Sequence, residues 1–255
     1  MAYTTINKST DYFNTKLHSG NSSTQSITGV GFQPDFTWIK DRTGGNDHQI
    51  VDAVRGATYA ISSNRNDNLT FTDGLTSFDS DGYSLGNNTR YNASGSNYVG
   101  WNWKANGAGS ANTSGSINST VSVNTTSGFS IVKWTGTGAN ATVGHGLGAV
   151  PKMIIVKDTD ASDNWNVYHV GIGNDSHLHL NLDFAASGSS TYWQDYTPTN
   201  NVFYIGSDSA INASGNDFIA YCFAEKTGYS KFGTYIGDGT TDNAFIYTGF
   251  KPTFF

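Results

Sequence analysis

Short runs of alternating apolar and polar residues, separated by turns rich in Gly, Asn and Asp, follow one another along the whole chain. In FTWIKD (36–41) and KMIIVKD (152–158) the alternation follows closely after a proline, a residue that is typical of the start or edge of a strand. FDSDGYSLG (78–86) predicts a hairpin that turns at Asp81–Gly82. No segment sustains the 3.6-residue period of an amphipathic helix. The pattern therefore predicts an all-β protein.

Several phrases occur more than once. YNASGSNYVGWNWKA (91–105) aligns without a gap with INASGNDFIAYCFAE (211–225), and GFQPDFTWIKD (31–41) aligns with GAVPKMIIVKD (148–158). From residue 228 the opening phrase starts a third time, and GFKPTFF aligns with GFQPDFT. Self-similarity of this kind indicates tandem structural units. Because the third phrase stops within an expected strand, we expect the natural chain to continue past Phe255.

These repeats define the expected domains. They are an N-terminal arm at 1–11, a first β-sandwich repeat at 12–105, a linker at 106–128, a second β-sandwich repeat at 129–227 and the beginning of an incomplete third repeat at 228–255. The linker is assigned from its Gly, Ser, Thr and Asn content, with one short strand expected at 117–123. Sheets of many short strands commonly close as jelly-roll or concanavalin-like sandwiches, and we expect that fold for each repeat.

The closing strand of each repeat carries large rings at alternate positions. In the first repeat Val99, Trp101 and Trp103 share one side, and we expect that side to face inward and cover the sheet of its own repeat. The second repeat has Ile219, Tyr221 and Phe223 at the corresponding positions. The residues expected to form the structural core are Trp101, Trp103, Tyr221 and Phe223.

Composition and charge exclude several functions. Only 13% of the residues are charged, the net charge is −6 and the pI is about 5.3, so the chain has no basic stripe with which to bind nucleic acid. No run of about eighteen apolar residues predicts a membrane span. The single cysteine, Cys222, cannot form an internal disulfide.

Three tryptophans outside the closing strands are candidates for stacking against a glycan. They are Trp38, Trp165 and Trp193. A flat exposed indole suits the apolar face of a sugar, but a large aromatic side chain more often fills a core. Both interpretations stay open at the level of the sequence.

Two groups of polar residues are candidates for binding a metal. His177 and His179 lie on one side of an expected strand, and His169 precedes them on a neighbouring one, so three imidazoles could bind a divalent ion. Asp79 and Asp81 match part of a calcium loop. The alternative is that Asp81 only serves the hairpin turn, because the full alternation of acidic ligands is absent.

No catalytic constellation emerges. Asp52 and Arg55 form a local charged pair, which predicts either a buried clamp or a ligand-binding arginine. Glycan hydrolysis needs two carboxylates across a cleft, and the candidates Asp183, Asp195 and Glu225 do not recur as a pair between the repeats. There is no G-x-S-x-G nucleophile motif. We expect a protein that is not an enzyme and needs no cofactor, with calcium as the one alternative.

Long phrases of the chain resemble a family of virion structural proteins from marine tailed phages of the cyanophage and pelagiphage type. The phrases are AYTTINKSTDYFNTKLHSGNSSTQSITGVGFQPDFTWIKDR, VDAVRG, SFDSDGYSLG and YVGWNWKANG in the first repeat, GFSIVKWTGTGANATVGHGLGAVPKMIIVKD and NWNVYH in the second, and FIYTGFKPTFF at the end. The resemblance covers nearly the whole chain. It implies a tail-fibre-like protein of the virion with tandem lectin-like sandwiches and no assigned catalytic residues.

The resemblance also implies partners. We expect a homo-oligomer, a trimer if the protein is a fibre, attached to other virion proteins through the arm at 1–11 and displayed for contact with a host-surface glycan. A capsid-decorating protein is one alternative, and a glycan-binding lectin or depolymerase module is another.

Overall fold

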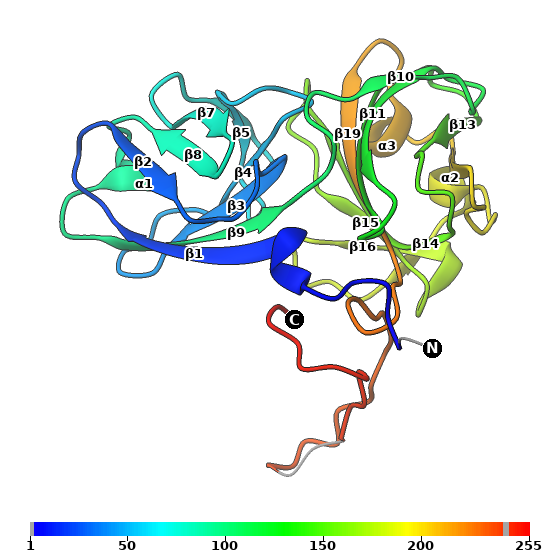
Figure 1. The fold of residues 1–255 in the computed structure, drawn as a ribbon. Coiled ribbons are helices and arrows are strands. Elements are labelled where there is room, and N and C mark those ends of the chain that lie inside the picture. Colours follow the sequence, from blue (N-terminus) through cyan, green and yellow to red (C-terminus); the bar gives the residue numbers. More distant parts are fainter. Residues whose placement is uncertain (1–2, 242–244) are drawn as a thin grey trace.

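The computed structural model of the chain describes residues 3–241 and 245–255, and it is almost entirely antiparallel β-structure (Figure 1). These residues contain nineteen strands, three α-helices of one turn each and one short 3-10 helix, η1 (Ser9–Asp11). The predicted all-β class is confirmed. None of the helices in the described part of the chain is long and apolar enough to cross a membrane.

Two β-sandwich-like units lie one after the other along the chain, seen as the blue-to-cyan and green-to-orange lobes of Figure 1. The main sheet of the first unit contains, in spatial order, β1 (Phe13–Ser19), β9 (Asn97–Trp103), β3 (Phe36–Asp41), β4 (Gln49–Asp52), β5 (Tyr59–Ile61) and β6 (Asn68–Thr70). Its second sheet contains β2 (Gln25–Thr28), β8 (Gly82–Leu85) and β7 (Leu75–Asp79). Helix α1 (Thr89–Asn92) connects β8 to β9.

The second unit is built from a larger main sheet. In spatial order this sheet contains β10 (Ser110–Asn112), β11 (Ser119–Asn124), β12 (Phe129–Thr135), β19 (Asp217–Ala224), β14 (Pro151–Asp158), β15 (Asn166–His169), β16 (Gly173–His179) and β17 (Ser187–Gly188). The opposite layer contains β13 (Ala141–Gly144), β18 (Val202–Ile205), α2 (Ser190–Trp193) and α3 (Ser209–Asn212).

The stretch 106–128 is a correction to the sequence prediction. The short strand expected at 117–123 is present as β11, but the stretch is not a free linker, because β10 and β11 pair with each other and β11 pairs along its whole length with β12. The composition misled because small polar residues can form strands here, as β11 buries Ser119 and Ser122 beside Val121. Val121 is the main apolar contribution of β11 to the core, so a segment poor in bulky residues still forms part of a sheet.

The repeated phrases occupy equivalent places in the two units. Strand β9 lies between β1 and β3, and β19 lies between β12 and β14 in the same antiparallel arrangement. Both closing strands are therefore central strands of their main sheets. This shared position explains why one phrase appears twice.

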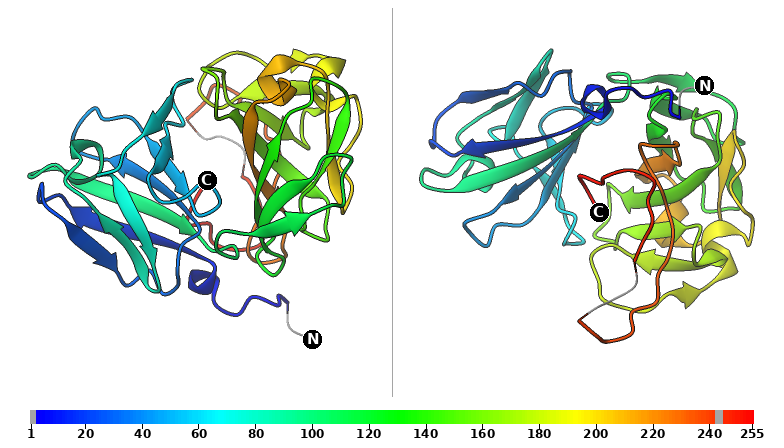
Figure 2. Two further views of the ribbon diagram at one scale, coloured as in Figure 1. Left: turned by 90° about the horizontal axis from the view of Figure 1, so that it is seen from above. Right: turned by 60° about the horizontal axis from the view of Figure 1, so that its bottom comes forward.

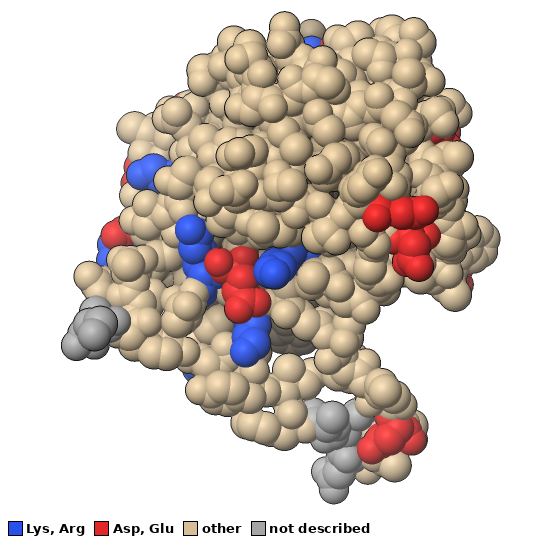
Figure 3. All heavy atoms as spheres, turned by 90° about the vertical axis from the view of Figure 1, so that its right-hand side faces the viewer, with Lys and Arg blue, Asp and Glu red and all other residues tan. Residues whose placement is uncertain are grey.

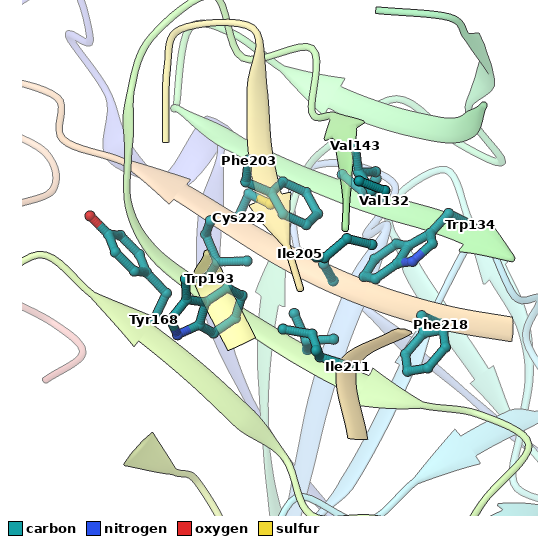
Figure 4. Close-up of a cluster of buried hydrophobic side chains, with 14 of the residues drawn as sticks. Val132, Trp134, Val143, Tyr168, Trp193, Phe203, Ile205, Ile211, Phe218 and Cys222 are labelled. Atoms are coloured by element: carbon teal, nitrogen blue, oxygen red, sulfur yellow. The ribbon is translucent and has the colours of Figure 1, made fainter. Parts of the chain in front are cut away.

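Each unit has a core of its own between its two layers. The first is formed by Ile27, Val30, Phe32, Ile39, Val51, Ala60, Leu75, Tyr83, Leu85, Tyr91 and Tyr98. In the second unit Trp134 stacks on Phe218 at a centroid distance of 5.4 Å and meets Phe203 edge-on (Figure 4). Burial of such rings contributes about 2 kcal/mol or more each.

A third core lies between the two units. Phe36, Ile50 and Ile61 of the first main sheet pack with residues of the second, where Phe129, Ile131, Ile155, Trp165, Val167, Ile219 and Tyr221 are buried. The outer faces of the two main sheets are thus joined by an apolar layer. The Phe36 and Tyr221 rings meet at 4.5 Å in this layer.

The expected direction of the closing strands is wrong. Tyr98 of β9 faces the core of its own unit, and Phe218, Ala220 and Cys222 of β19 do the same. The large rings at the other positions face away from their own sandwich and toward the joint. Because β9 and β19 are covered on both faces, the alternation shows which residues share a side but not which side meets which layer.

The beginning of a third repeat, expected at 228–255, stays a prediction. Apart from an isolated bridge between Lys226 and Ser230, the described residues of this segment form no strand. We call 231–255, as far as it is described, the tail. It leaves the second unit at its base and returns to end beside the first unit (Figures 1 and 2).

Candidate functional site

A buried polar cluster ties the two units together inside the third core. The Arg55 guanidinium donates through Nε to the Asp52 carboxylate at 2.5 Å, and the Tyr221 hydroxyl donates to the same carboxylate oxygen at 2.8 Å. Asp52 and Tyr221 are fully buried, and Asp52 also caps the following turn by accepting the amides of Val54 and Arg55. Sequence analysis left Arg55 as a clamp or a ligand-binding residue, and the structure places it in the clamp.

The electrostatics of this cluster are set by burial and by the ion pair. Burial raises the pKa of Tyr221 well above its ordinary value, so its hydroxyl keeps the proton that it donates to Asp52. Burial opposes the charge on Arg55, but Asp52 and Tyr221 together outweigh it and raise the pKa of the guanidinium. Since Tyr221 comes from the second unit and Asp52 from the first, the cluster fixes their relative register.

Two of the three candidate glycan-stacking tryptophans are buried. Trp165 is fully enclosed in the third core and donates its Nε1 hydrogen to the Ser62 carbonyl at 2.9 Å. Trp193 lies in the core of the second unit, edge-on to Tyr168 at 5.9 Å. A glycan cannot reach either ring in the folded chain. Both are corrections to the candidate site.

Trp38 is different, because it belongs to a partly exposed row of rings that we call the aromatic shelf. The aromatic shelf is formed by Phe13, Trp38, Trp101 and Trp103, from β1, β3 and β9. Trp101 pairs with Trp38 across the strands and the two rings meet edge-on at 6.1 Å. The Trp38 Nε1 hydrogen is donated to His48 Nδ1 at 2.9 Å, which fixes the indole plane.

The end of the tail covers the aromatic shelf. Phe254 contacts all four shelf rings, with centroid distances of 5.3 Å to Trp103, 5.7 Å to Trp101, 6.0 Å to Phe13 and 6.3 Å to Trp38. It is itself 43% exposed. Trp101, expected as core, is therefore half-buried beneath the tail. Tyr221 is fully buried in the third core, and the half-buried Trp103 and Phe223 pack against that core. Only the single rings were visible in the sequence; their assembly across three strands was not.

The histidines do not assemble into a metal site. His177 and His179 adjoin each other at 5.1 Å, but the His177 ring stacks on Tyr192 at 3.7 Å. His169 lies toward the other end of the hairpin, where it pairs with Gly173. No group of three or more His, Cys, Asp or Glu that could hold a metal occurs among the residues that the structure describes.

The two aspartates of the hairpin are occupied by protein donors. Asp81 accepts the amides of Gly31 at 2.6 Å and Gly29 at 2.9 Å, and these hydrogen bonds lower the pKa of its carboxyl group. Asp79 accepts the hydroxyls of Ser77 and Ser84. Both carboxylates thus hold neighbouring strands and loops together, and this arrangement does not form a calcium loop.

The repeated NASG turn has a structural role that the sequence did not disclose. Asn92 is fully buried; its side chain donates to the Gly86 carbonyl at 2.8 Å and accepts the Asn21 amide at 2.9 Å. Asn212 repeats the arrangement with Gly206 at 3.0 Å and the Thr137 amide at 2.9 Å. The repetition of the phrase at both sites was the available signal. Each asparagine joins a one-turn helix to the loop that follows β1 in the first unit and β12 in the second.

The Lys-Asp pair at the end of β3 and β14 is a second repeated structural device. Lys157 Nζ is buried and donates to the carbonyls of Asp158 at 2.6 Å and Ala161 at 3.0 Å, and Lys40 Nζ donates to the Asn46 carbonyl at 2.6 Å. Burial lowers the pKa of Lys157 to about 8. These contacts close the loop after the strand.

Comparison with known proteins gives one family. The chain matches the model of a domain of unknown function, DUF7483, over residues 8–255. No curated protein and no solved structure matches the chain. With nearly its whole length matched, the chain belongs to the DUF7483 family.

Proposed function

We propose that the chain is a non-enzymatic structural protein of a phage virion, of the tail-fibre or adhesin type, whose paired sandwiches are displayed for attachment to a host surface. Within this proposal each unit is of the jelly-roll or concanavalin-like type. The observation that carries it is the buried joint between the units, in which an apolar layer surrounds the Asp52–Arg55–Tyr221 cluster.

The joint supports a mechanical role because it replaces a flexible connection with a packed one. Residues from two separate sheets share one core, and a fully buried ion pair bridged by a tyrosine sets their register. Breaking such a pair leaves an uncompensated buried charge, which costs several kcal/mol. Two repeats joined in this way act as one stiff block, which is what a projecting or surface-covering protein needs.

The surface supports an extracellular setting in concentrated salt. On the face drawn in Figure 3 most of the surface is uncharged, and the few Lys, Arg, Asp and Glu side chains lie mainly low on the second unit. Exposed ion pairs contribute less than about 1 kcal/mol each and are screened by salt. A fold held by buried rings and hydrogen-bonded turns loses little stability under those conditions.

Quantitative mass spectrometry of purified particles of the encoding virus tests the proposal. We expect the chain among the particle proteins, at roughly a dozen copies for a tail component and at hundreds for a capsid-decorating protein, which is the close alternative. A chain that is made during infection but absent from washed particles would rule out both positions.

Glycan binding at the aromatic shelf is the second candidate function. It is favoured by the half-buried rings of Trp38 and Trp101, which lie side by side on one face of a rigid sheet and from which a glycan would displace Phe254. A glycan array with the full chain and with Trp38→Ala tests it. Binding that the substitution abolishes supports a lectin role, and binding that survives in the variant excludes the shelf.

A further inference from the structure

We propose that the free edge of β1 accepts a strand from the tail of a second copy of this chain. Strand β1 is the outermost strand of the first main sheet, and among the described residues it pairs with β9 alone. The other three outermost strands of the two main sheets, β6, β10 and β17, have only 3, 3 and 2 residues, whereas β1 has 7. Short edges discourage pairing between molecules, and a long edge invites it.

The second unit shows what belongs at this position. Strand β12 is the counterpart of β1, since each pairs with the closing strand of its unit. On its other side β12 is covered by β11 over six residue pairs, from Ser119–Trp134 to Asn124–Phe129. In the first unit the described residues supply no strand at the corresponding place. The first main sheet therefore lacks a neighbour that the second one has.

The side chains of the free edge suit an added strand. Leu17, near the end of β1, is 60% exposed. The Thr15 amide donates to the side-chain oxygen of Asn14 at 3.0 Å and not to a neighbouring strand. A backbone that adds to this edge would bury Leu17 and complete the hydrogen bonding of β1.

The tail is the segment of this chain that fits the role of donor. It repeats phrases that lead into strands of the complete units, as GFKPTFF repeats GFQPDFT, which ends in the first two residues of β3, yet its described residues form no strand. Its apolar side chains are exposed, with Ile246 at 53% and Tyr235, Ile236, Phe245 and Tyr247 exposed as well. Contiguous exposed apolar residues mark an interaction surface.

The tail also already reaches the neighbourhood of β1. Phe254 packs against Phe13, the first residue of β1, at 6.0 Å, but the described residues of the tail do not pair with the β1 edge. If two copies exchange tails, each tail can pair with the open β1 edge of the other copy, and its apolar side chains become covered. The exchange uses surfaces that the chain already has. The inference deepens the proposed structural role and rests on it for its setting.

Light scattering coupled to gel filtration, with the full chain from about 1 µM to about 500 µM, tests the exchange. We expect masses at multiples of 27.3 kDa that increase with concentration. Leu17→Lys places a charge on the edge, and Ile246→Lys places one in the donor; each should weaken association at least tenfold. Leu182→Lys, the same change at an exposed leucine of the second unit, should leave association unchanged.

Hydrogen exchange of the β1 amides supplies the second readout. Their protection should increase with protein concentration in the wild-type chain and not in Leu17→Lys. A chain that stays monomeric throughout, or one in which Leu182→Lys acts as strongly as Leu17→Lys, overturns the exchange. So does loss of association in Leu17→Lys with none in Ile246→Lys, because the tail is then not the donor.

The two proposals can fail separately. A monomeric chain that is nevertheless found in particles removes the strand exchange and keeps the virion role. A chain that associates through β1 but is absent from particles removes the virion role and keeps the strand exchange.

Discussion

The Tyr221 hydroxyl of the second unit donates to the Asp52 carboxylate of the first at 2.8 Å, with both groups fully buried. The two residues lie 169 positions apart in the chain. The same carboxylate oxygen binds Arg55, so one atom links a turn of the first unit to the central strand of the second. The joint between the units is therefore specified by a polar contact as well as by apolar packing.

Replacing Tyr221 by Phe tests that contact. The ring stays in place, but Asp52 loses a hydrogen bond inside the protein, so the free energy of unfolding should decrease by about 1–3 kcal/mol. Urea unfolding of the full chain measures it. Tyr196→Phe, at an exposed ring, should change stability by less than about 0.5 kcal/mol. Equal effects of the two substitutions would mean that the buried hydroxyl contributes nothing.

The two repeated asparagines should behave alike. Asn92→Ala and Asn212→Ala each leave a buried amide and buried carbonyls without partners, and each should lower the free energy of unfolding by at least about 2 kcal/mol. Asn87→Ala, at an exposed position near α1, is the matched control. A large effect at only one of the buried sites would contradict the equivalence of the units.

His145 makes stability sensitive to acid. It is fully buried, its Nδ1 accepts the Leu147 amide at 3.2 Å, and burial lowers its pKa to about 4. The unfolded chain takes up a proton near pH 6.5 while the folded chain resists it, so stability is lost as the pH falls from 6.5 toward 4, by at most roughly 3 kcal/mol.

The measurement is urea unfolding at pH 7.5, 6 and 5. His145→Gln should show a shallower decrease than the wild type over this range, although it is less stable at pH 7.5. The remaining slope belongs to other half-buried histidines, such as His18 and His48, whose pKa values burial also lowers. If the slope of stability against pH is unchanged in the variant, His145 does not contribute to the loss of stability in acid.

Lys157 acts in the opposite pH range. Burial lowers its pKa to about 8, below the ordinary value of 10.5, so above pH 8 the folded chain loses a proton that the unfolded chain still holds. Stability should therefore increase from pH 8 to pH 9.5, by about 1–2 kcal/mol from this group. Lys157→Met should remove that increase and Lys40→Met, at the equivalent position, should keep it. An identical profile in both variants would contradict the assignment.

The sequence predicted the strands and their equivalence well, because both depend on local patterns. Alternation shows which residues of β9 share a side, and the repeated phrases predict that β9 and β19 occupy equivalent positions in their sheets. The sequence does not predict which layer each side of the strand packs against, because Trp103 and Tyr221 have the same alternation whether they face a sandwich core or a neighbouring unit. Trp165 illustrates the difficulty: its hydrogen-bond partner, the Ser62 carbonyl, belongs to the other unit.

In two segments the sequence pattern and the strands that form differ, for one physical cause. At 106–128 the chain is poor in bulky residues, yet β11 gains its place through backbone hydrogen bonds to β12. The described residues of 231–255 include apolar side chains typical of a strand, yet they pair with no strand of either sheet. Strand formation depends on a neighbouring edge, and a local pattern does not reveal where that edge is.

Differential scanning calorimetry of the full chain tests most directly whether the two units form one block. If the third core and the Asp52–Tyr221 contact join them as described, the sandwiches unfold together, in one transition whose calorimetric and van't Hoff enthalpies agree. Two separate transitions, each with the enthalpy of a single sandwich, would show that the units are independent and would contradict the account.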